Sequence, residues 1–457
     1  STLRLGLFQG CLGCLAVIFA GLLNRVMISE LAFPGLLVGG ALAFEQFVAP
    51  SRIWFGQMSD ARPIGGRHRL PYIWLGTLLF CGLAVLSVPL IFHVATLLRE
   101  GSRGALLGGV AALCGLFAAY GLAVSMATTP YLALVIDRTT EEQRPRAVGL
   151  IWCLLTVGIV VGAIAISLSL RGLDGVTDPS MLREVLLRFM GRAVLAVLAL
   201  TLVATVVMEP PSLPGRPMAD GAGENGPTLP QAWALITSSK QVLVFFSFLV
   251  LFTLGLFLQD PILESYGAEV FGMPIAATAS LNATWGVGTL LGLLMAGLWI
   301  GPKLGKFSAA RLGCRLIVAT LALLLLVGAT GRVPFLQGVM FLFGLAAGIA
   351  TNSALVLMLD LTLPQAAGTF VGVWGLAQAL SRALGKVFGG GLLDLGRALQ
   401  QHWRPSVASP FPAYALVLGV EILVALAALL VLSRVNLQQF REDTGRSLSQ
   451  VLELELG

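Results

Sequence analysis

Long apolar segments alternate with short polar connectors along the whole chain. A helix that crosses a bilayer needs roughly 20 consecutive apolar residues, and about twelve segments of this chain meet that requirement. The expected spans are 5–28, 34–57, 71–96, 104–136, 146–170, 186–208, 238–263, 275–300, 309–330, 333–359, 365–396 and 408–434. The pattern predicts an all-α, polytopic membrane protein.

The longest interruption of the apolar pattern is at residues 209–237. This segment is rich in proline and glycine and lacks any apolar period. Such composition is typical of a linker. It predicts an N-terminal six-helix bundle at 1–208, a cytoplasmic linker at 209–237 and a C-terminal six-helix bundle at 238–434. The tail at 435–457 is amphipathic and ends acidic, so it fits either a membrane surface or a protein partner.

The two predicted bundles are related to each other in sequence. A shift of 223 residues aligns Gly121 with Gly344 and Asp137 with Asp360 without a gap, and it also aligns two Val-Gly pairs. An internal duplication explains these matches. Two six-span repeats joined by a central linker are the organisation of the major facilitator fold, in which the halves rock about a cavity near the bilayer midplane.

Composition and charge agree with a membrane protein and indicate its orientation. The chain is 57% hydrophobic and 11% charged, which excludes a soluble globule of 457 residues. With the expected spans, seventeen lysines and arginines fall on the side of the termini and nine on the other. The excess predicts cytoplasmic termini. The net charge of +6 therefore indicates topology and contact with anionic lipid, and no nucleic-acid partner is expected.

No motif of the chain predicts an enzyme or a metal-ion site. The sequence has three histidines, all near loops or span ends, and neither a phosphate-binding loop nor a serine–histidine–carboxylate grouping. Cys11 and Cys14 have CxxC spacing, but neither a second pair nor a nearby histidine accompanies them. All six cysteines fall within or next to spans, where a small side chain packs well.

The first strongly charged interruption is GQMSDARPIGGRHR, residues 56–69, between the second and third spans. It resembles the loop signature of the major facilitator superfamily, with extra residues between the acid and the Gly-Arg pair. The matching positions are Gly56, Asp60, Gly66, Arg67 and Arg69. The resemblance implies that the acid latches the two halves together on the cytoplasmic side, with the N-terminal dipole of span eleven as its natural partner.

A second charged loop follows span four and contains Asp137 and Arg144. Asp60 and either Arg144 or Arg146 are candidates for a charge network between the two loops. The same residues also fit ordinary solvated loop charges, and the sequence leaves both interpretations open.

Ionisable residues inside the spans are candidates for a functional cavity. Arg25 lies near the end of span one, where it either reaches the membrane interface or forms an ion pair. Glu45 in the middle of span two is a possible partner, because an unpaired carboxylate there costs several kcal/mol unless it is protonated or hydrated.

The second half carries more of these polar positions. Asp260 and Glu264 flank the helix-breaking Pro261. Gln378, Arg382 and Lys386 are spaced four apart, so they share one face of span eleven, which should contact protein or water. This face is predicted either to line the cavity and bind a carboxylate or to lie partly at the cytoplasmic end.

Several segments closely resemble one branch of the superfamily, the PucC-like bacteriochlorophyll-delivery proteins. The resemblance covers both halves, and its most specific strings are NRVM at 24–27 and RLPYIW at 69–74. The run FVAPSRIWFGQ at 47–57 is most similar to cyanobacterial members. The resemblance implies a photosynthetic (thylakoid) membrane, chlorophyll or a related tetrapyrrole as ligand or cargo, and assistance to photosystem or light-harvesting proteins during assembly.

The sequence leaves two functions open. For a pigment carrier, chlorophyll magnesium needs one axial ligand, and the intramembrane candidates are Gln46, Asn282, Asn352 and Gln378, although each also fits a helix-to-helix hydrogen bond. For a proton-coupled carrier of a small anionic solute, Glu45, Asp260 or Glu264 takes up the proton. In that carrier Arg25 or Arg382 contacts the solute.

Overall fold

The computed structural model describes residues 2–138, 144–173, 178–206, 208–209, 240–360, 367–403 and 409–436, and these are almost entirely helical. The helices are α1 Thr2–Ala16, α2 Gly35–Phe47, α3 Ser51–Ala61, α4 Leu70–Glu100, α5 Arg103–Asp137, α6 Arg144–Leu170, α7 Pro179–Thr205, α9 Lys240–Phe257, α10 Leu263–Phe271, α11 Ile275–Met295, α12 Gly301–Leu304, α13 Lys306–Gly328, α14 Val333–Asp360, α15 Ala367–Trp403 and α16 Phe411–Leu432.

Nine helical segments of the described chain are long and apolar enough to cross a membrane. The broken segment α2–α3, the shorter helix α9 and the more polar helix α15 account for the other three of the twelve expected spans. The chain is therefore an integral membrane protein of the expected all-α class. Most of the predicted linker and tail, at 210–239 and 437–457, lies outside the described residues.

Several expected span boundaries differ from the helix ends, such as the end expected at residue 396, because α15 runs to Trp403. The span expected at 34–57 is not one helix, because α2 ends at Phe47 and α3 begins at Ser51, after Pro50. The span expected at 186–208 begins earlier, with Pro179 in the first turn of α7 and Asp178 as its cap. Arg183, expected in the loop before this span, is therefore part of the helix.

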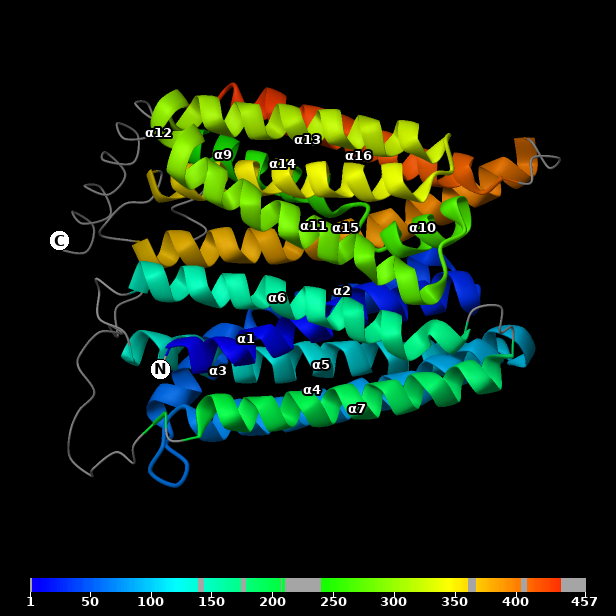
Figure 1. Cartoon of the computed structure of the whole chain (residues 1–457), viewed down its shortest axis with the longest axis horizontal. Helices are drawn as coiled ribbons and strands as arrows, with labels where there is room; N and C mark the ends of the chain where they lie inside the picture. Colours follow the sequence, from blue (N-terminus) through cyan, green and yellow to red (C-terminus); the bar gives the residue numbers. More distant parts are fainter. Residues whose placement is uncertain are drawn as a thin grey trace, which may run out of the picture.

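The helices run roughly parallel, and the bundle has two distinct ends (Figure 1). The start of α1, the α3–α4 loop and the end of α16 lie at the left-hand end in that view, which we call the α3–α4 end. The short helix α10 lies at the opposite end, the α10 end. Both ends of the described chain thus lie on one side of the bundle, as an even number of spans requires.

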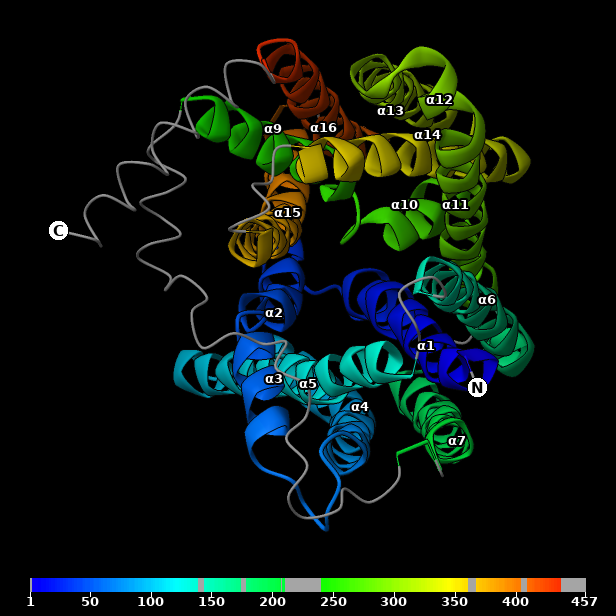
Figure 2. The ribbon, with the colours of Figure 1, turned by 90° about the vertical axis from the view of Figure 1, so that its left-hand side faces the viewer.

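Figure 2 views the bundle along the helices from the α3–α4 end, with the first-half helices α1–α7 below and the second-half helices α9–α16 above. The halves meet where α2 packs on α15 and where α6 packs on α11. Glycines allow close approach there, since a Cβ on Gly35 would come within 2.6 Å of the Gly390 carbonyl oxygen. Small residues at helix crossings are typical of membrane bundles, where apolar burial gives no driving force.

Helix ends in the two halves follow the same 223-residue repeat. α5 and α14 end at Asp137 and Asp360, and the next helices begin at residues 144 and 367, so both boundaries are 223 residues apart. The aligned glycines have the same role as well. Gly121 packs against the backbone of Glu45 on α2, and Gly344 packs against the backbone of Trp285 on α11.

Candidate functional site

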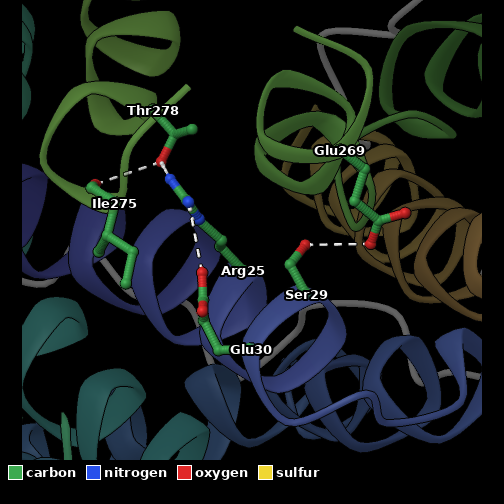
Figure 3. A network of polar contacts seen from close by, with 6 residues as sticks. All are labelled: Arg25, Ser29, Glu30, Glu269, Ile275 and Thr278. Carbon is green, nitrogen blue, oxygen red and sulfur yellow. Dashed lines mark hydrogen bonds and ion pairs between the residues drawn. The ribbon is translucent and has the colours of Figure 1, made fainter. Parts of the chain in front are cut away.

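Arg25 lies in the first span, which continues α1 as far as Glu30. It is in the short stretch between the π-helical segments Val17–Leu23 and Val26–Glu30. Its side chain is buried, with 5% of the residue exposed. One guanidinium nitrogen donates to Thr278 Oγ1 at 3.0 Å and another lies 3.3 Å from Glu30 Oε1 (Figure 3). Arg25 therefore pairs with Glu30, five residues away, and reaches α11 in the other half. The pairing with Glu45 considered from sequence does not form.

A second contact between the halves lies beside the first, at the residue next to Arg25. The amide nitrogen of Asn24 donates to the carbonyl oxygen of Pro261 at 2.6 Å. Pro261 lies in the turn between α9 and α10, as its lack of an N–H group predicts. On the other side of the break, Glu421 Oε1 accepts from the backbone N–H of Gln259 at 3.3 Å. Side chains from both halves thus satisfy backbone groups that the helix break leaves open.

Glu264 is the most enclosed of the predicted proton carriers, with 1% of the residue exposed. Asn282 Nδ2 donates to its Oε1 at 2.5 Å. Gly21 of the first span lies against the same oxygen, since a Cβ there would come within 2.5 Å of it. The second carboxyl oxygen, Oε2, is buried and has no hydrogen-bond partner among the described residues. A buried carboxylate held on one side only is a suitable proton acceptor.

The α10 end is closed by further contacts between the halves. Ser29 Oγ donates to Glu269 Oε1 at 3.2 Å (Figure 3), and Arg397 Nη2 binds the same carboxylate at 2.9 and 3.0 Å. Asp394 on α15 accepts from two backbone N–H groups at the start of α2, those of Gly35 at 2.6 Å and Leu36 at 2.7 Å. A carboxylate at a helix N-terminus satisfies open N–H groups and the helix dipole together.

Two residues of the basic face of α15, Arg382 and Lys386, contact side chains of other helices. Lys386 is buried and its Nζ lies 3.9 Å from Glu45 Oε2 of α2. The Arg382 guanidinium lies 4.7 Å from the centroid of the Phe257 ring, and its side chain is otherwise exposed. Asp260 is close enough to both cations to interact with them electrostatically. Glu45, Asp260, Arg382 and Lys386 thus form one charged cluster between the halves, which we call the interface charge cluster.

The candidate pigment ligands divide into two groups. Asn282 is engaged with Glu264, which is the helix-to-helix hydrogen bond considered from sequence. The side chains of Gln46, Asn352 and Gln378 are half-buried and form no hydrogen bond with another described residue. Within the described part of the structure, their amide oxygens are candidate ligand atoms.

The loop signature between α3 and α4 forms a tight turn. Gly65 and Gly66 have φ of +59° and +72°, and the N–H and carbonyl groups of Ile64 and Arg67 bond each other across them at 2.9 and 3.2 Å. Two central residues with positive φ characterise a type I′ turn, which glycine adopts without strain. The residues that extend the usual signature thus build a hairpin turn.

The α3–α4 loop is held by a residue that the sequence did not single out. Glu209, after α7, accepts backbone hydrogen bonds from His68, Arg69 and Leu70 at 2.7–3.0 Å and so caps α4. Arg69 is buried and donates to Ser59 Oγ at 2.7 Å. The only sequence signal for Glu209 is an acid directly after an apolar span.

Other members of the loop signature are placed only in part. Gly56 lies on α3 with room for a Cβ at 3.4 Å from Thr129. The side chains of Asp60, Asp137 and Arg144 lie outside the described part of the structure, so the proposed network between the two loops stays a prediction.

The fold and sequence are both similar to known proteins. The sequence model described as "PUCC protein" matches residues 22–440. A Rhodobacter capsulatus protein, described by its place in the puhA-bchM intergenic region, is 32% identical over 429 residues, which cover 92% of this chain and 86% of that protein. Protein PucC of Rhodovulum sulfidophilum is 30% identical over 400 residues, which cover 86% of this chain and 85% of that protein.

Among solved structures, a bacterial homologue of the human lysosomal transporter Spinster, in an inward-facing and unoccupied conformation, is similar with a TM-score of 0.67. The two chains are 14% identical, and the similarity covers 97% of each. At this identity the likeness establishes the fold alone, and it confirms the expected transporter architecture of the major facilitator type. Because the PUCC family model spans both halves of the molecule, the chain belongs to the PUCC protein family.

Proposed function

We propose that this protein handles chlorophyll-type pigment in a photosynthetic (thylakoid) membrane and assists the assembly of light-harvesting or photosystem proteins. The observation that carries the proposal is family membership over residues 22–440, which include both halves and the interface between them. The resemblance of the run at 47–57 favours a cyanobacterial-type member. The proposed partners are the pigment and the proteins that receive it.

The chemistry of the interface supports this proposal. Chlorophyll magnesium takes a fifth ligand, and magnesium prefers oxygen donors such as amide carbonyl groups. Gln46 on α2, Asn352 on α14 and Gln378 on α15 each offer such an oxygen, with no hydrogen bond to another described residue. A pigment bound between the halves would be released when the contacts between the halves rearrange.

The experiment is a pigment analysis of the protein purified in mild detergent from its own membranes. The sample is first freed of photosystem and light-harvesting proteins, which an immunoblot verifies. Its absorption spectrum and solvent extract should then show chlorophyll in stoichiometric amount. Colourless protein that also fails to take up added chlorophyll in detergent would contradict the proposal.

Matched variants locate the pigment. Asn352→Leu and Gln378→Leu remove two of the candidate oxygens at nearly constant side-chain volume. If one of these residues is the magnesium ligand, the protein with that replacement should lose most of its pigment. Gln401→Leu makes the same chemical change at an exposed position near the end of α15 and should retain it. Equal pigment in all three variants would exclude Asn352 and Gln378 and leave Gln46 as the candidate to be replaced next.

The interface charge cluster favours a second candidate, proton-coupled transport of a small anionic solute. Glu264 has a buried carboxyl oxygen without a hydrogen-bond partner among the described residues, and the exposed Arg382 of the interface charge cluster offers a cation for the solute. Glu264→Gln keeps the acceptor for Asn282 but cannot change charge. In reconstituted vesicles this variant should lose solute-driven proton flux while assembly of pigment proteins in cells is unaffected. Absence of any flux in the wild-type protein would exclude this candidate.

A further inference from the structure

An apolar groove of about 370 Å³ opens on the outer side of the N-terminal half, between α1, α6 and α7. α1 packs against both other helices and lies between them when viewed along the bundle (Figure 2). Gly10 on α1 and Gly158 on α6 line the groove and also touch each other, so the two helices are in close contact there. The groove is separate from the interface between the halves.

The rim of the groove faces the membrane. Val157 and Val161 of α6 and Leu200 of α7 line it and are 48%, 55% and 43% exposed. Aliphatic side chains exposed along membrane-spanning helices are in contact with lipid. The groove is therefore entered from the hydrocarbon region of the bilayer.

One charged residue, Arg192, lines this groove. It is the single ionisable residue of the apolar run from Phe189 to Thr205 on α7, and it is exposed. Among the described residues it has no hydrogen-bond or ion-pair partner. One turn earlier, Arg188 forms an ion pair with Glu184. Arg188 therefore has a counter-ion within the described part of the protein, and Arg192 has none there.

The depth of Arg192 fits a lipid headgroup at the α10 end. Helical side chains point back towards the N-terminus of their helix, and α7 begins at that end. The Arg192 guanidinium thus reaches towards the exposed polar turn that contains Arg188, at the border of the apolar run. From Phe189 to Leu200 the groove extends along α7 for about 16 Å at 1.5 Å per residue, close to the half-thickness of a hydrocarbon core of about 30 Å.

We propose that this groove is a binding site for an anionic phospholipid. The lipid phosphate pairs with Arg192, and one acyl chain lies along the groove between α6 and α7. The guanidinium offers the paired donors that match phosphate oxygens. An intramembrane cation without a protein partner is stabilised by such a counter-ion, whereas a zwitterionic lipid would bring a second positive charge to the same place.

Native mass spectrometry of the delipidated full-length protein tests this site. The protein in detergent is titrated with dioleoylphosphatidylglycerol and, separately, with dioleoylphosphatidylcholine. The wild-type protein should bind one phosphatidylglycerol at least about tenfold more tightly than phosphatidylcholine, as a charge-assisted hydrogen bond implies. Equal affinity for the two lipids would mean ordinary boundary lipid and would overturn the proposal.

Three variants assign the site. Arg192→Gln should abolish the preference for phosphatidylglycerol, while Arg188→Gln, the same change one turn away, should preserve it. Ala196→Phe, at an exposed position of the groove wall, should weaken binding of both lipids by filling the space for the chain. Gel filtration and thermal unfolding verify that each variant is folded. An equal loss for Arg188→Gln and Arg192→Gln would indicate general attraction to a basic surface and contradict a specific site.

Discussion

The carboxylate of Asp394 on α15 lies 2.6 Å from the backbone nitrogen of Gly35, the first residue of α2 in the other half of the molecule. It also accepts from the next N–H group, so this contact between the halves is a charged cap of a helix. The cap works only while α2 and α15 are close, because both hydrogen bonds cross between the halves. We therefore expect these two hydrogen bonds to break when the α10 end opens.

Replacement of Asp394 by Asn should weaken closure of the α10 end. The amide keeps one acceptor but loses the charge, and hydrogen bonds to charged groups contribute about 1.5–3 kcal/mol each. A cysteine introduced at Ser29 in this background should react faster with a membrane-impermeant maleimide than the same cysteine in wild-type protein. Glu184→Asn, at an exposed position of α7, is the control. Equal labelling in all backgrounds would show that the cap does not hold the halves together.

Much of the fold follows from the sequence, because span length and apolar composition are local properties. The break at Pro50 shows the limit of such reasoning. Pro89 and Pro130 lie inside the continuous helices α4 and α5, so a proline alone does not identify a break. Whether the helix continues depends on neighbouring helices that satisfy the freed backbone groups, which is a property of tertiary structure.

The candidate site was predictable in its residue types but not in its pairings. Buried charge in a membrane requires a partner, which drew attention to Arg25 and Lys386, and both are buried and ion-paired. The identity of each partner depends on helix rotation and register, so Glu30 rather than Glu45 pairs with Arg25. Glu209 shows the same limit, because its contacts to the start of α4 join residues about 140 positions apart.

Loss of the Glu209 carboxylate should loosen the α3–α4 loop. Removal of a helix N-cap costs about 0.5–2 kcal/mol, and Glu209 satisfies three N–H groups at once. In Glu209→Ala, hydrogen exchange should accelerate in a peptide containing residues 68–72 and remain unchanged in the middle of α4. Glu100→Ala, at the other end of the same helix, is the control. Unchanged exchange at 68–72 would mean that the loop is held by other contacts.

The ion pair between Glu45 and Lys386 should be visible as coupling in a double-mutant cycle. Each single replacement by Gln leaves one charge without its nearest partner at a half-buried site. The double variant removes both charges, so it should be less destabilised than the sum of the singles by about 0.5–3 kcal/mol, the range for residues in contact. The measurement is unfolding of the purified protein in detergent. Strict additivity would show that the charges act independently of each other.

The aligned glycines of the repeat should not tolerate a larger side chain. Gly344 on α14 packs directly on the Trp285 carbonyl of α11, whereas a Cβ added at Gly338 on the same helix would enter open space. Gly344→Val should separate the two helices and destabilise the fold by about 1–3 kcal/mol, the usual effect of overpacking. Gly338→Val should be nearly neutral.

The same test applies to the first half, where Gly121 packs on the backbone of Glu45 and a Cβ added at Gly115 of α5 would meet nothing within 4 Å. If the two halves descend from one six-span unit, Gly121→Val and Gly344→Val should lower the thermal unfolding temperature to a similar extent, and Gly115→Val should behave like Gly338→Val. A large effect in one half alone would mean that the repeated glycines no longer support equivalent helix crossings. The sequence alignment would then record ancestry without a shared packing constraint.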